Sequence, residues 1–520
     1  MHELNKYSGS SLPRRTTKMP GSTTLEFDNA AYRGSISLNT GLFIDGKWVD
    51  PVEPDMIDII NPASGKKIAA VSLGSSKDVD IAVKAAQKAY KTTWGLKCPG
   101  SQRGKLLTRL ADLMERDIDQ FTALESLNGG KPFAVAKGVD LAGAISTIRY
   151  FGGWADKIHG KTIESNETKL AYTRHEPYGV VGQIIPWNFP ILMLSWKAGP
   201  ALATGNCIVL KPSEMTPLSA LKFAELVAEA GFPPGVVNIV NGYGKTVGQA
   251  ISEHMHISKV AFTGSTLVGR KILEAAARSN LKVVTLELGG KSPTVIFDDC
   301  NLDQTLKWAM QAMYLNMGQS CVAGSRMFVQ EGIYPEFMEK FTAMVKAFGE
   351  ATGDPFAPTT MHGPQVSQVQ FDRIMSYIAS GKESGATVHI GGDRHGTEGY
   401  FIQPTIFTDC TPDMKIVKEE IFGPVVAVMK FKTEEEVIEA ANATDYGLSA
   451  CVFSENVGRA LRVAHAFESG SVFVNSAQLI ECSIPFGGYK ASGIGREQGE
   501  YALETYTQVK AVHVNTGLII

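Results

Sequence analysis

Short runs rich in Val, Ile and Phe alternate with helix-like segments through the middle of this sequence, and this alternation restricts the fold more than any other feature. From residue 178 onward the runs are "GVVGQIIPW", "CIVLKPS", "VVNIVNG", "KVAFTGS" and "KVVTLELGG", with segments such as "LSALKFAELVAEAG" and "TVGQAISEH" between them. Parallel strands need a crossover connection, which is usually a helix, so such alternation indicates a parallel sheet covered by helices. The pattern predicts a dinucleotide-binding type of architecture.

The regions on either side of this block also have readable patterns. Between about 290 and 485, the runs "SRMFVQ", "ATVHIGG", "VVAVMKF" and "SACVFS" and the helical stretches "YPEFMEKFTAMVKAFGE" and "GRALRVAHAFES" indicate a second α/β unit. Between 36 and 150 we expect strands in "LFIDGKWVD" and "MIDIINPASGKKIAAVS", followed by long helices. At 520 residues the chain is too long for one core, so two or three domains are expected.

The first 35 residues are rich in Ser, Thr and Gly and lack an apolar segment. They therefore do not resemble a secretory signal. A basic, amphipathic mitochondrial transit peptide is the alternative, but Pro13 and Pro20 interrupt any such helix. We expect residues 1–35 to be a disordered tail and the protein to be cytoplasmic, with a mitochondrial location as the alternative.

The composition excludes several classes of partner. The chain is 44% hydrophobic and 20% charged, with a net charge of −3, which is typical of a soluble globular protein and gives no basic surface for nucleic acid or anionic membranes. No apolar run reaches the ~18 residues of a membrane span. The seven cysteines are scattered without a C-x-x-C pair, which argues against disulfides or a metal site and favours a reducing compartment.

Cys321 is the first candidate for chemistry. It lies in "YLNMGQSCVAGSR", among small residues that offer backbone N–H groups and little apolar packing. A structural cysteine usually lies among large apolar side chains, whereas a reactive one must be reached and ionised. A lone cysteine is nevertheless often inert, so other residues must decide its role.

Glu287 and Asn188 are candidates at the ends of two predicted strands. Glu287 ends an apolar run before two glycines, where loss of solvent would raise its pKa toward that of a general base, unless it only pairs with Lys291. Asn188 lies in "IIPWNFP", where the prolines make the loop rigid; its amide could donate to an oxyanion or merely brace the loop.

Two further turns are candidates for ligand binding. Lys211 and Glu214 follow a strand in "LKPSEMTP", at the end where parallel sheets bind ligands, although a helix-capping turn would look the same. Gly264 and Ser265 follow another strand and open a helix, whose N-terminus could hold a pyrophosphate or carry only an ordinary cap. No G-x-G-x-x-G follows any of the strands.

Together these motifs resemble the aldehyde dehydrogenase superfamily. The order "PWNFP", "KPSEMTP", "FTGS", "LELGGKSP", "GQSC" and "EEIFGP", and the interval of 34 residues between Glu287 and Cys321, agree with that family over about residues 40–515. The resemblance is closest to the NAD-linked, broad-specificity branch, which is similar to cytosolic and mitochondrial aldehyde and retinal dehydrogenases. It explains the missing glycine fingerprint, because this family binds its dinucleotide differently.

The resemblance implies roles for the three candidates. Cys321 would attack the aldehyde carbon to give a thiohemiacetal, Asn188 and the Cys321 N–H would bind the oxyanion, and Glu287 would activate water to release the acid. NAD would accept the hydride. NADP would bind more weakly, because Glu214 would lie near the 2′-phosphate. No metal is expected.

The resemblance also assigns a cofactor site and a substrate tunnel. The cofactor would be bound by Ile184, Ile185, Pro186, Trp187, Lys211, Glu214, Gly244, Phe262, Thr263, Gly264, Ser265, Val268, Leu288, Gly289, Gln370, Arg373, Glu420 and Phe422. The tunnel would be lined by Gly143, Phe189, Leu192, Met193, Trp196, Leu315, Ser320, Val322, Ile480 and Phe486. These tunnel residues are mostly apolar and include no Arg or Lys, so medium-chain or aromatic aldehydes are expected. Met317 and Arg373 depart from the commoner family residues, which puts cofactor affinity in doubt.

The expected fold class is α/β, with a Rossmann-like parallel-sheet NAD-binding domain, an α/β catalytic domain and a small β oligomerisation element. We expect residues 36–158 and 178–288 in the NAD-binding domain and residues 289–505 in the catalytic domain. Residues 159–177 and 506–520 would form strands that pair across subunits into a dimer or tetramer.

Three other functions compete with this hypothesis. A CoA-acylating semialdehyde dehydrogenase is disfavoured by Glu287, which such relatives generally lack. A non-enzymatic structural protein on the same scaffold is disfavoured by the intact Cys321, Glu287 and Asn188. A thiol hydrolase would not need the strand–helix units or the "FTGS" turn.

Overall fold

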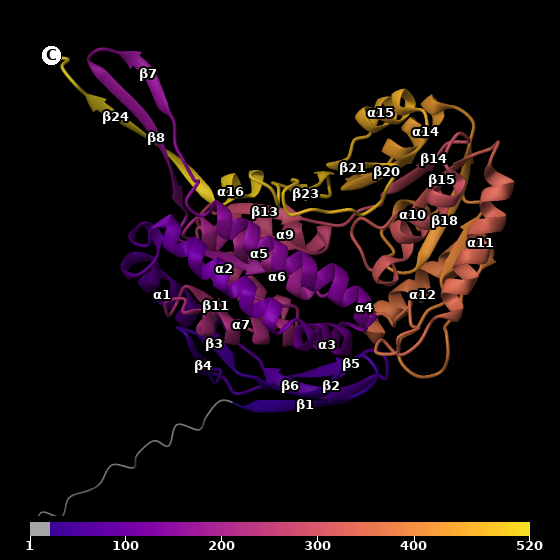
Figure 1. The fold of residues 1–520 in the computed structure, drawn as a ribbon, viewed down its shortest axis with the longest axis horizontal. Helices are drawn as coiled ribbons and strands as arrows, with labels where there is room; N and C mark the ends of the chain where they lie inside the picture. The colour runs from indigo at the N-terminus through magenta and orange to yellow at the C-terminus, as the bar shows by residue number, and fades with distance from the viewer. Residues whose placement is uncertain (1–20) are drawn as a thin grey trace, which may run out of the picture.

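Two helix-covered sheets lie side by side, and a narrow three-stranded arm extends away from the first of them (Figure 1). The computed structural model describes residues 21–520, and residues 1–20 lie outside the described part of the chain. Within residues 21–520, no helix is both long enough and apolar enough to cross a membrane.

The first sheet has the strand order β23-β13-β12-β9-β10-β11-β3-β4. Its strands are β3 (Leu42–Ile44), β4 (Lys47–Val49), β9 (Val180–Ile184), β10 (Cys207–Lys211), β11 (Val237–Ile239), β12 (Lys259–Thr263), β13 (Val283–Glu287) and β23 (Gly493–Ile494). The strands from β13 to β11 are parallel, whereas β3, β4 and β23 pair antiparallel at the edges. The predicted parallel sheet is therefore confirmed, and its central strands are buried along their whole length.

Helices cover this sheet, as the alternation of apolar runs and helix-like segments predicted. They are α1 (Ser76–Thr92), α2 (Gly100–Arg116), α3 (Ile118–Gly129), α5 (Ala142–Trp154), α6 (Pro190–Ala203), α7 (Leu218–Ala230), α8 (Gln249–Glu253) and α9 (Thr266–Arg278). A capping box begins α1, with the Ser75 N–H donating to the Asp78 carboxylate over 2.8 Å. α6 packs against β10 and is backed by α2 and α5, so it lies deep in the molecule.

The second sheet has the order β16-β17-β18-β15-β14-β20-β21. Its strands are β14 (Pro293–Ile296), β15 (Arg326–Gln330), β16 (Thr387–Ile390), β17 (Thr405–Thr408), β18 (Val425–Phe431), β20 (Ser449–Phe453) and β21 (Ser471–Val474). Its helices include α10 (Leu302–Tyr314), α11 (Tyr334–Glu350), α12 (Gln368–Glu383), α14 (Glu434–Asn442) and α15 (Val457–Ala466). The second α/β unit predicted from the sequence is confirmed.

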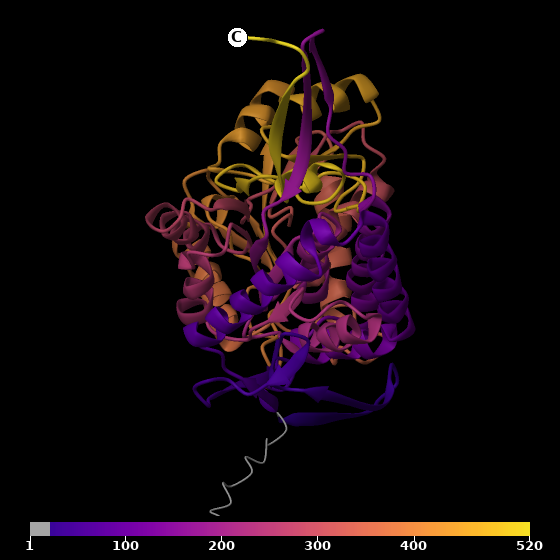
Figure 2. The ribbon, with the colours of Figure 1, turned by 90° about the vertical axis from the view of Figure 1, so that its left-hand side faces the viewer.

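The arm consists of β7 (Thr162–Asn166), β8 (Lys169–Pro177) and β24 (Thr507–Asn515). β24 pairs antiparallel with β8 along its whole length, from Thr507 opposite Pro177 to Asn515 opposite Lys169. Both views show the arm projecting from the body (Figures 1 and 2). Both predicted strand segments therefore lie in one sheet.

The expectation of a disordered tail up to residue 35 is wrong for its second half. β1 (Ser22–Asp28) and β2 (Arg33–Asn39) form an antiparallel hairpin. Leu25, Phe27, Ile36 and Leu38 are buried and pack near the paired strands β5 (Met56–Asn61) and β6 (Lys66–Ser72). Their alternation with polar residues has the period of a half-buried strand, which the Ser- and Thr-rich composition obscured. The rest of the predicted tail, residues 1–20, lies outside the described residues.

The end of α3 connects the two α/β units. Gly130 follows the helix in the left-handed conformation, with a φ of 76°, which is a common way for a helix to end. Pro132 then begins α4 (Phe133–Val135), and the π-helix η2 (Ala136–Leu141) continues into α5. The Phe133 N–H donates to the Pro355 carbonyl over 2.9 Å, so this segment is joined to the chain that precedes α12.

Replacement of Gly130 by Ala should lower the temperature of thermal unfolding. A Cβ there would lie 2.6 Å from Pro364 Cγ and 2.9 Å from Pro62 Cγ. The left-handed backbone adds about 1–2 kcal/mol of strain for a residue with a side chain. Gly129→Ala is the matched control, because a Cβ at Gly129 meets no heavy atom within 4 Å. Calorimetry at one fixed scan rate makes the comparison, and equal unfolding temperatures for the two variants would contradict this reading.

Candidate active site

Cys321 lies on the connection from α10 to β15, in a backbone that small residues make possible. Just before it, the short turn η4 (Leu315–Gly318) contains the left-handed residues Asn316 and Met317, with φ of 52° and 57°. A Cβ on Gly318 would lie 2.2 Å from the Gly423 carbonyl oxygen, and a Cβ on Gly324 would lie 2.2 Å from Thr294 Oγ1. Larger residues would therefore push neighbouring segments away from the thiol.

The Cys321 thiol is half-buried in the wall of a cavity of about 700 Å³. Burial raises its pKa to about 12, and the charges of Glu420 and Glu287 act in the same direction. The backbone N–H groups of Cys321 and Val322 act against them. The thiol therefore needs a nearby base or cation before it can react as a thiolate.

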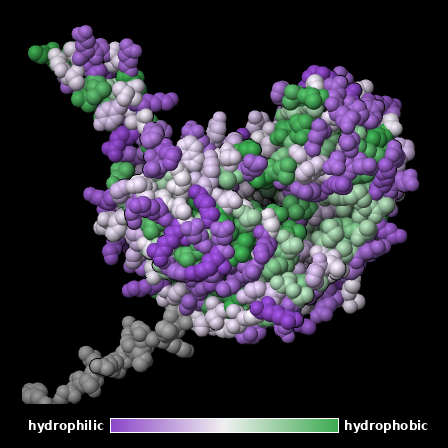
Figure 3. Space-filling view, viewed as in Figure 1, coloured by the Kyte–Doolittle hydropathy of each residue, from purple (hydrophilic) through white to green (hydrophobic). Residues whose placement is uncertain are grey.

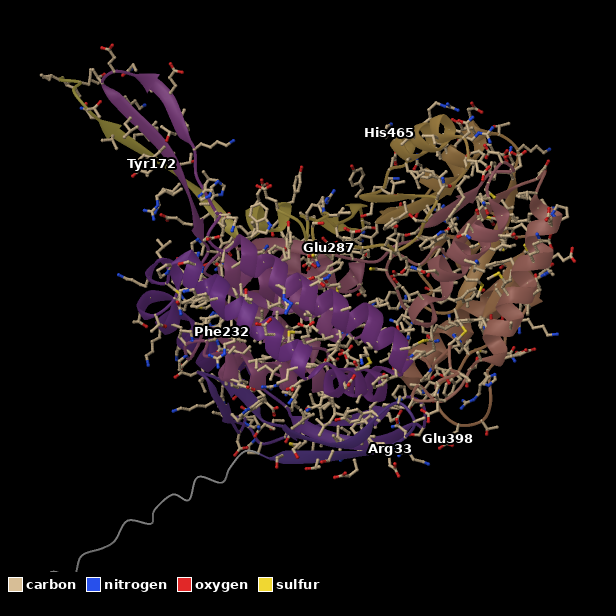
Figure 4. All side chains as sticks on the ribbon, in the orientation of Figure 1. Arg33, Tyr172, Phe232, Glu287, Glu398 and His465 are labelled. Atoms are coloured by element: carbon tan, nitrogen blue, oxygen red, sulfur yellow. The ribbon has the colours of Figure 1, made fainter. Side chains whose placement is uncertain are left out.

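Glu287 ends β13 and lines the same cavity, at the junction of the two α/β units (Figure 4). Burial raises the pKa of Glu287 well above its usual range, and the neighbouring Glu497 raises it further. Its Oε2 atom is buried without a hydrogen-bond partner. The expected rise in pKa is confirmed, whereas the alternative of a pair with Lys291 is wrong, since the Lys291 ammonium donates to the Ile416 carbonyl over 2.8 Å.

A buried ion pair that we did not predict lies close to Glu287. Lys197, from α6, contacts Glu497 Oε1 at 2.5 Å and Thr263 Oγ1 at 2.6 Å. Its charge lowers the pKa of Glu287, against the larger effects of burial and of Glu497. Lys197 is the one charged residue of α6, whose other residues are apolar except for Ser195, and a lone charge on such a helix was the available signal.

Asn188 lies in the loop between β9 and α6 and is buried beside the Cys321 segment. Its side-chain amide donates to the Gln319 carbonyl over 3.0 Å, two residues before the thiol. Because an amide group carries two N–H bonds, one remains for a ligand. Asn188, Glu287 and Cys321 all line the one cavity. The structure thus brings together the three predicted catalytic residues.

Many of the predicted cofactor residues line this cavity too. They are Pro186, Trp187, Thr263, Gly264, Ser265, Leu288, Gly289, Gln370, Arg373, Glu420 and Phe422. Glu420 accepts from the Gly290 N–H over 2.9 Å, and burial raises its pKa to about 7. Gly289 leaves room for it, because a Cβ there would lie 2.3 Å from Glu420 Oε2. Gln370 donates to the Phe422 carbonyl over 2.8 Å, which holds this segment in place.

The other predicted cofactor residues lie outside the cavity lining, at or near the carboxyl ends of the parallel strands. They are Ile184, Ile185, Lys211, Glu214, Gly244, Phe262 and Val268. Lys211 ends β10 and contacts Glu214 Oε2 at 3.1 Å. Ser265 caps α9 by accepting from the Val268 N–H, which is the ordinary cap that the sequence left open as an alternative to a phosphate site. This edge of the sheet is where open α/β sheets bind ligands.

All ten predicted tunnel residues line the cavity. Apolar side chains gather around the hollow between the two units in the space-filling view (Figure 3). Sequence reasoning missed several lining residues, which are Gly138, Val139, Ala142, Ser146, Thr147, Gln311, Gln478, Leu479, Glu481, Cys482, Ser483 and Gln498. Those around Gly143 recur at helical spacing, so extending its helix face would have found them. Met317 is buried away from the cavity lining, whereas Arg373 is part of it.

Comparison with known proteins gives consistent results over nearly the whole chain. Residues 48–512 match the model of the aldehyde dehydrogenase family. An aldehyde dehydrogenase of Agaricus bisporus is 64% identical over 96% of this chain and 99% of its own, and one of Emericella nidulans is 58% identical over 92% and 95%.

Solved structures agree with these relatives. The structure of an aldehyde dehydrogenase from Bacillus cereus in complex with NAD+ is 47% identical, covers 92% of this chain and 97% of its own, and superposes with a TM-score of 0.90. The predicted fold class and resemblance are confirmed. This chain belongs to the aldehyde dehydrogenase family.

Proposed function

We propose that this aldehyde dehydrogenase uses NAD to oxidise aldehydes to carboxylic acids through a covalent intermediate on Cys321. The observation that carries the proposal is that one cavity is lined by the thiol, a buried carboxyl and a buried amide, contributed by both α/β units. These are the groups that acyl chemistry on a cysteine requires: a nucleophile, a base and an oxyanion donor.

The residues around the cavity suit a dinucleotide. Glu214 and Glu420 offer acceptors for ribose hydroxyls, and Phe422 lies with its ring centroid 5.2 Å from that of Trp187. The N-terminus of α9, a helix of 13 residues, offers backbone N–H groups to a phosphate. Bound NAD would take up the hydride that leaves the substrate carbon.

Cys321 and Asn188 would act first. The thiolate of Cys321 would add to the aldehyde carbon, and the new alkoxide would be bound by the Asn188 amide and the Cys321 N–H. Loss of hydride from the tetrahedral carbon would leave a thioester. Small residues beside the thiol would let both reactants approach it closely.

Glu287 would then act as the general base. Its carboxylate would take a proton from water as the water attacks the thioester, which releases the acid and returns the thiol. Burial raises the pKa of this carboxyl, which makes its carboxylate a stronger base than that of an exposed glutamate. The Lys197–Glu497 pair lies beside it and sets its charge environment.

Two alternatives from the sequence are less well supported. A CoA-acylating enzyme would not need a general base, yet Glu287 is buried in the cavity with a free oxygen atom. A purely structural protein would have no use for an open cavity lined by a thiol and ionisable groups. NADH formation measured with and without added CoA separates all three, because the proposed enzyme turns over without CoA, a CoA-acylating enzyme only with it, and a structural protein in neither case.

We also propose that the arm mediates self-association in a dimer or tetramer. β7 and β24 are the edges of its sheet, and Ile163, Leu170 and Val509 on the arm are exposed apolar residues. Exposed edges of this kind are available for pairing with another chain.

The seven cysteines are all free, which is usual in a reducing compartment, and we propose that the protein acts in the cytosol.

Cys321→Ala should abolish dehydrogenase activity, because only the thiol forms the covalent intermediate. Glu287→Gln should still give a burst of NADH, while steady turnover falls ~10²-fold or more. Stopped-flow and steady-state absorbance at the NADH band measure the two phases. Cys300→Ala, a change at a cysteine outside the cavity lining, is the control. Steady turnover by folded Cys321→Ala protein would contradict the proposed mechanism.

NAD should be preferred over NADP, and Glu214→Gln should narrow the preference. A 2′-phosphate near the Glu214 carboxylate would be disfavoured by about 1–4 kcal/mol, and the contact with Lys211 at 3.1 Å would soften that effect. The measurement is the ratio of kcat/KM for NAD to that for NADP. Glu253→Gln, at an exposed carboxylate on α8, should leave the ratio unchanged. A wild-type ratio at or below one would overturn the expectation.

Hexanal and a phenyl-bearing aldehyde should have higher kcat/KM than acetaldehyde, because each extra buried methylene can contribute ~0.8 kcal/mol. Gly143→Ala should reduce this advantage, since its Cβ would lie 2.8 Å from Leu192 Cδ1 and both residues line the cavity, which the added group would make narrower. Gly153→Ala, on the same helix, adds a Cβ that meets nothing within 4 Å. A wild-type kcat/KM for acetaldehyde equal to or above that for the two larger aldehydes would show that the tunnel is narrower than proposed.

A further inference from the structure

A buried lysine that does not line the cavity contacts the backbone of Asn188. Lys131 lies just after α3 and is 3% exposed. Its ammonium donates to the backbone carbonyl of Asn188 over 3.1 Å and lies 4.0 Å from the centroid of the Phe189 ring. One side chain therefore contacts both the predicted oxyanion donor and an aromatic residue of the tunnel wall.

One buried carboxylate pairs with this lysine, and a second buried carboxyl lies near it. Asp140, in the π-helix η2, is fully buried and forms an ion pair with the Lys131 ammonium. Glu125, on α3, is also buried, and burial together with the charge of Asp140 raises its pKa to about 7. π-helical turns are rare and often lie at functional sites. The turn here contributes Asp140 to the pair.

The backbone of Asn188 is fixed by a second donor. The Asn316 side-chain amide donates to the Asn188 carbonyl over 2.9 Å and to the Gln319 carbonyl over 3.1 Å. Lys131 and Asn316 together can occupy both lone pairs of the Asn188 carbonyl oxygen. The orientation of this peptide group, and so the direction in which its side chain leaves, is set from two sides.

The energetics favour a role beyond stability. A buried ion pair adds little to the free energy of unfolding compared with apolar residues of similar volume, because both charges lose their hydration. Stability alone would therefore be served by an apolar pair at Lys131 and Asp140. A fixed ammonium, by contrast, can hold a carbonyl in one place with a charge-assisted hydrogen bond.

We propose that Lys131 is a positioning residue, which, held by Asp140, orients Asn188 so that its amide meets the alkoxide. The inference rests on the oxyanion role of Asn188 given in the proposed function. Lys131 itself lies outside the lining of the cavity and acts through Asn188.

The test is a double-mutant cycle on the rate of the NADH burst, counted per active thiol. Lys131→Met should slow the burst about 10- to 100-fold, as misplacement of a reacting group does, while the Kd of NAD is unchanged. In an Asn188→Ala background the same change should have less than a twofold further effect, because the group that Lys131 positions is already absent. Active thiols are titrated with a thiol reagent before each measurement.

Two further variants are controls, one for the buried charge that Lys131→Met leaves unpaired and one for the loss of any lysine from this region. Asp140 would be left as an unpaired buried charge by Lys131→Met, so the double change Lys131→Met with Asp140→Asn is measured in parallel. Lys137→Met, in the same π-helix, removes only the exposed ion pair with Asp119 and is the matched control. It should leave the burst rate unchanged.

The possible outcomes separate the inference from the mechanism on which it rests. A slower burst in the Lys131 variants that disappears in the Asn188→Ala background supports positioning. An equal fold-loss in both backgrounds, or fewer active thiols that each react at the wild-type rate, would overturn the inference while leaving the proposed function intact. A wild-type burst rate in Asn188→Ala alone would overturn the oxyanion assignment, and with it the role of Lys131.

Discussion

The hydrogen bond from the Asn188 amide to the Gln319 carbonyl, 3.0 Å long, joins the two halves of the site. Asn188 follows a strand of the first sheet, whereas Gln319 belongs to the connection between α10 and β15 of the second unit. The proposed nucleophile and its proposed oxyanion donor thus come from the two separate α/β units, so the proposed site needs both units. The cavity, the thiol and the carboxyl at the end of β13 meet only because the two sheets are held side by side.

Burial gives the site a common electrostatic character. It raises the pKa of the Cys321 thiol and of the Glu287 and Glu420 carboxyls, because each would carry a negative charge in a medium that solvates charge poorly. Each of these groups would ionise more readily beside a cation.

The sequence was most informative where local patterns determine structure. The Val- and Ile-rich runs identified the parallel strands because a strand buried on both faces must be apolar throughout. The small residues around Cys321 marked a crowded backbone. The β1–β2 hairpin is hidden by the Ser- and Thr-rich composition around it, and only the alternation of Leu25 and Phe27 with polar neighbours indicates a strand.

Lys197 and Lys131 could not have been assigned roles from sequence, because their partners are far away in the chain. Glu497 lies 300 positions from Lys197, and Asn188 lies 57 from Lys131. Only the packing of α6, η2 and the loop after β9 brings such groups together. The same packing stabilises the strained turn of Asn316 and Met317, since left-handed residues persist only where their surroundings hold them. Asn316 contributes to that stabilisation itself, because its amide binds the carbonyls of both Asn188 and Gln319. The strain before Cys321 and the placement of Asn188 therefore depend on one set of hydrogen bonds.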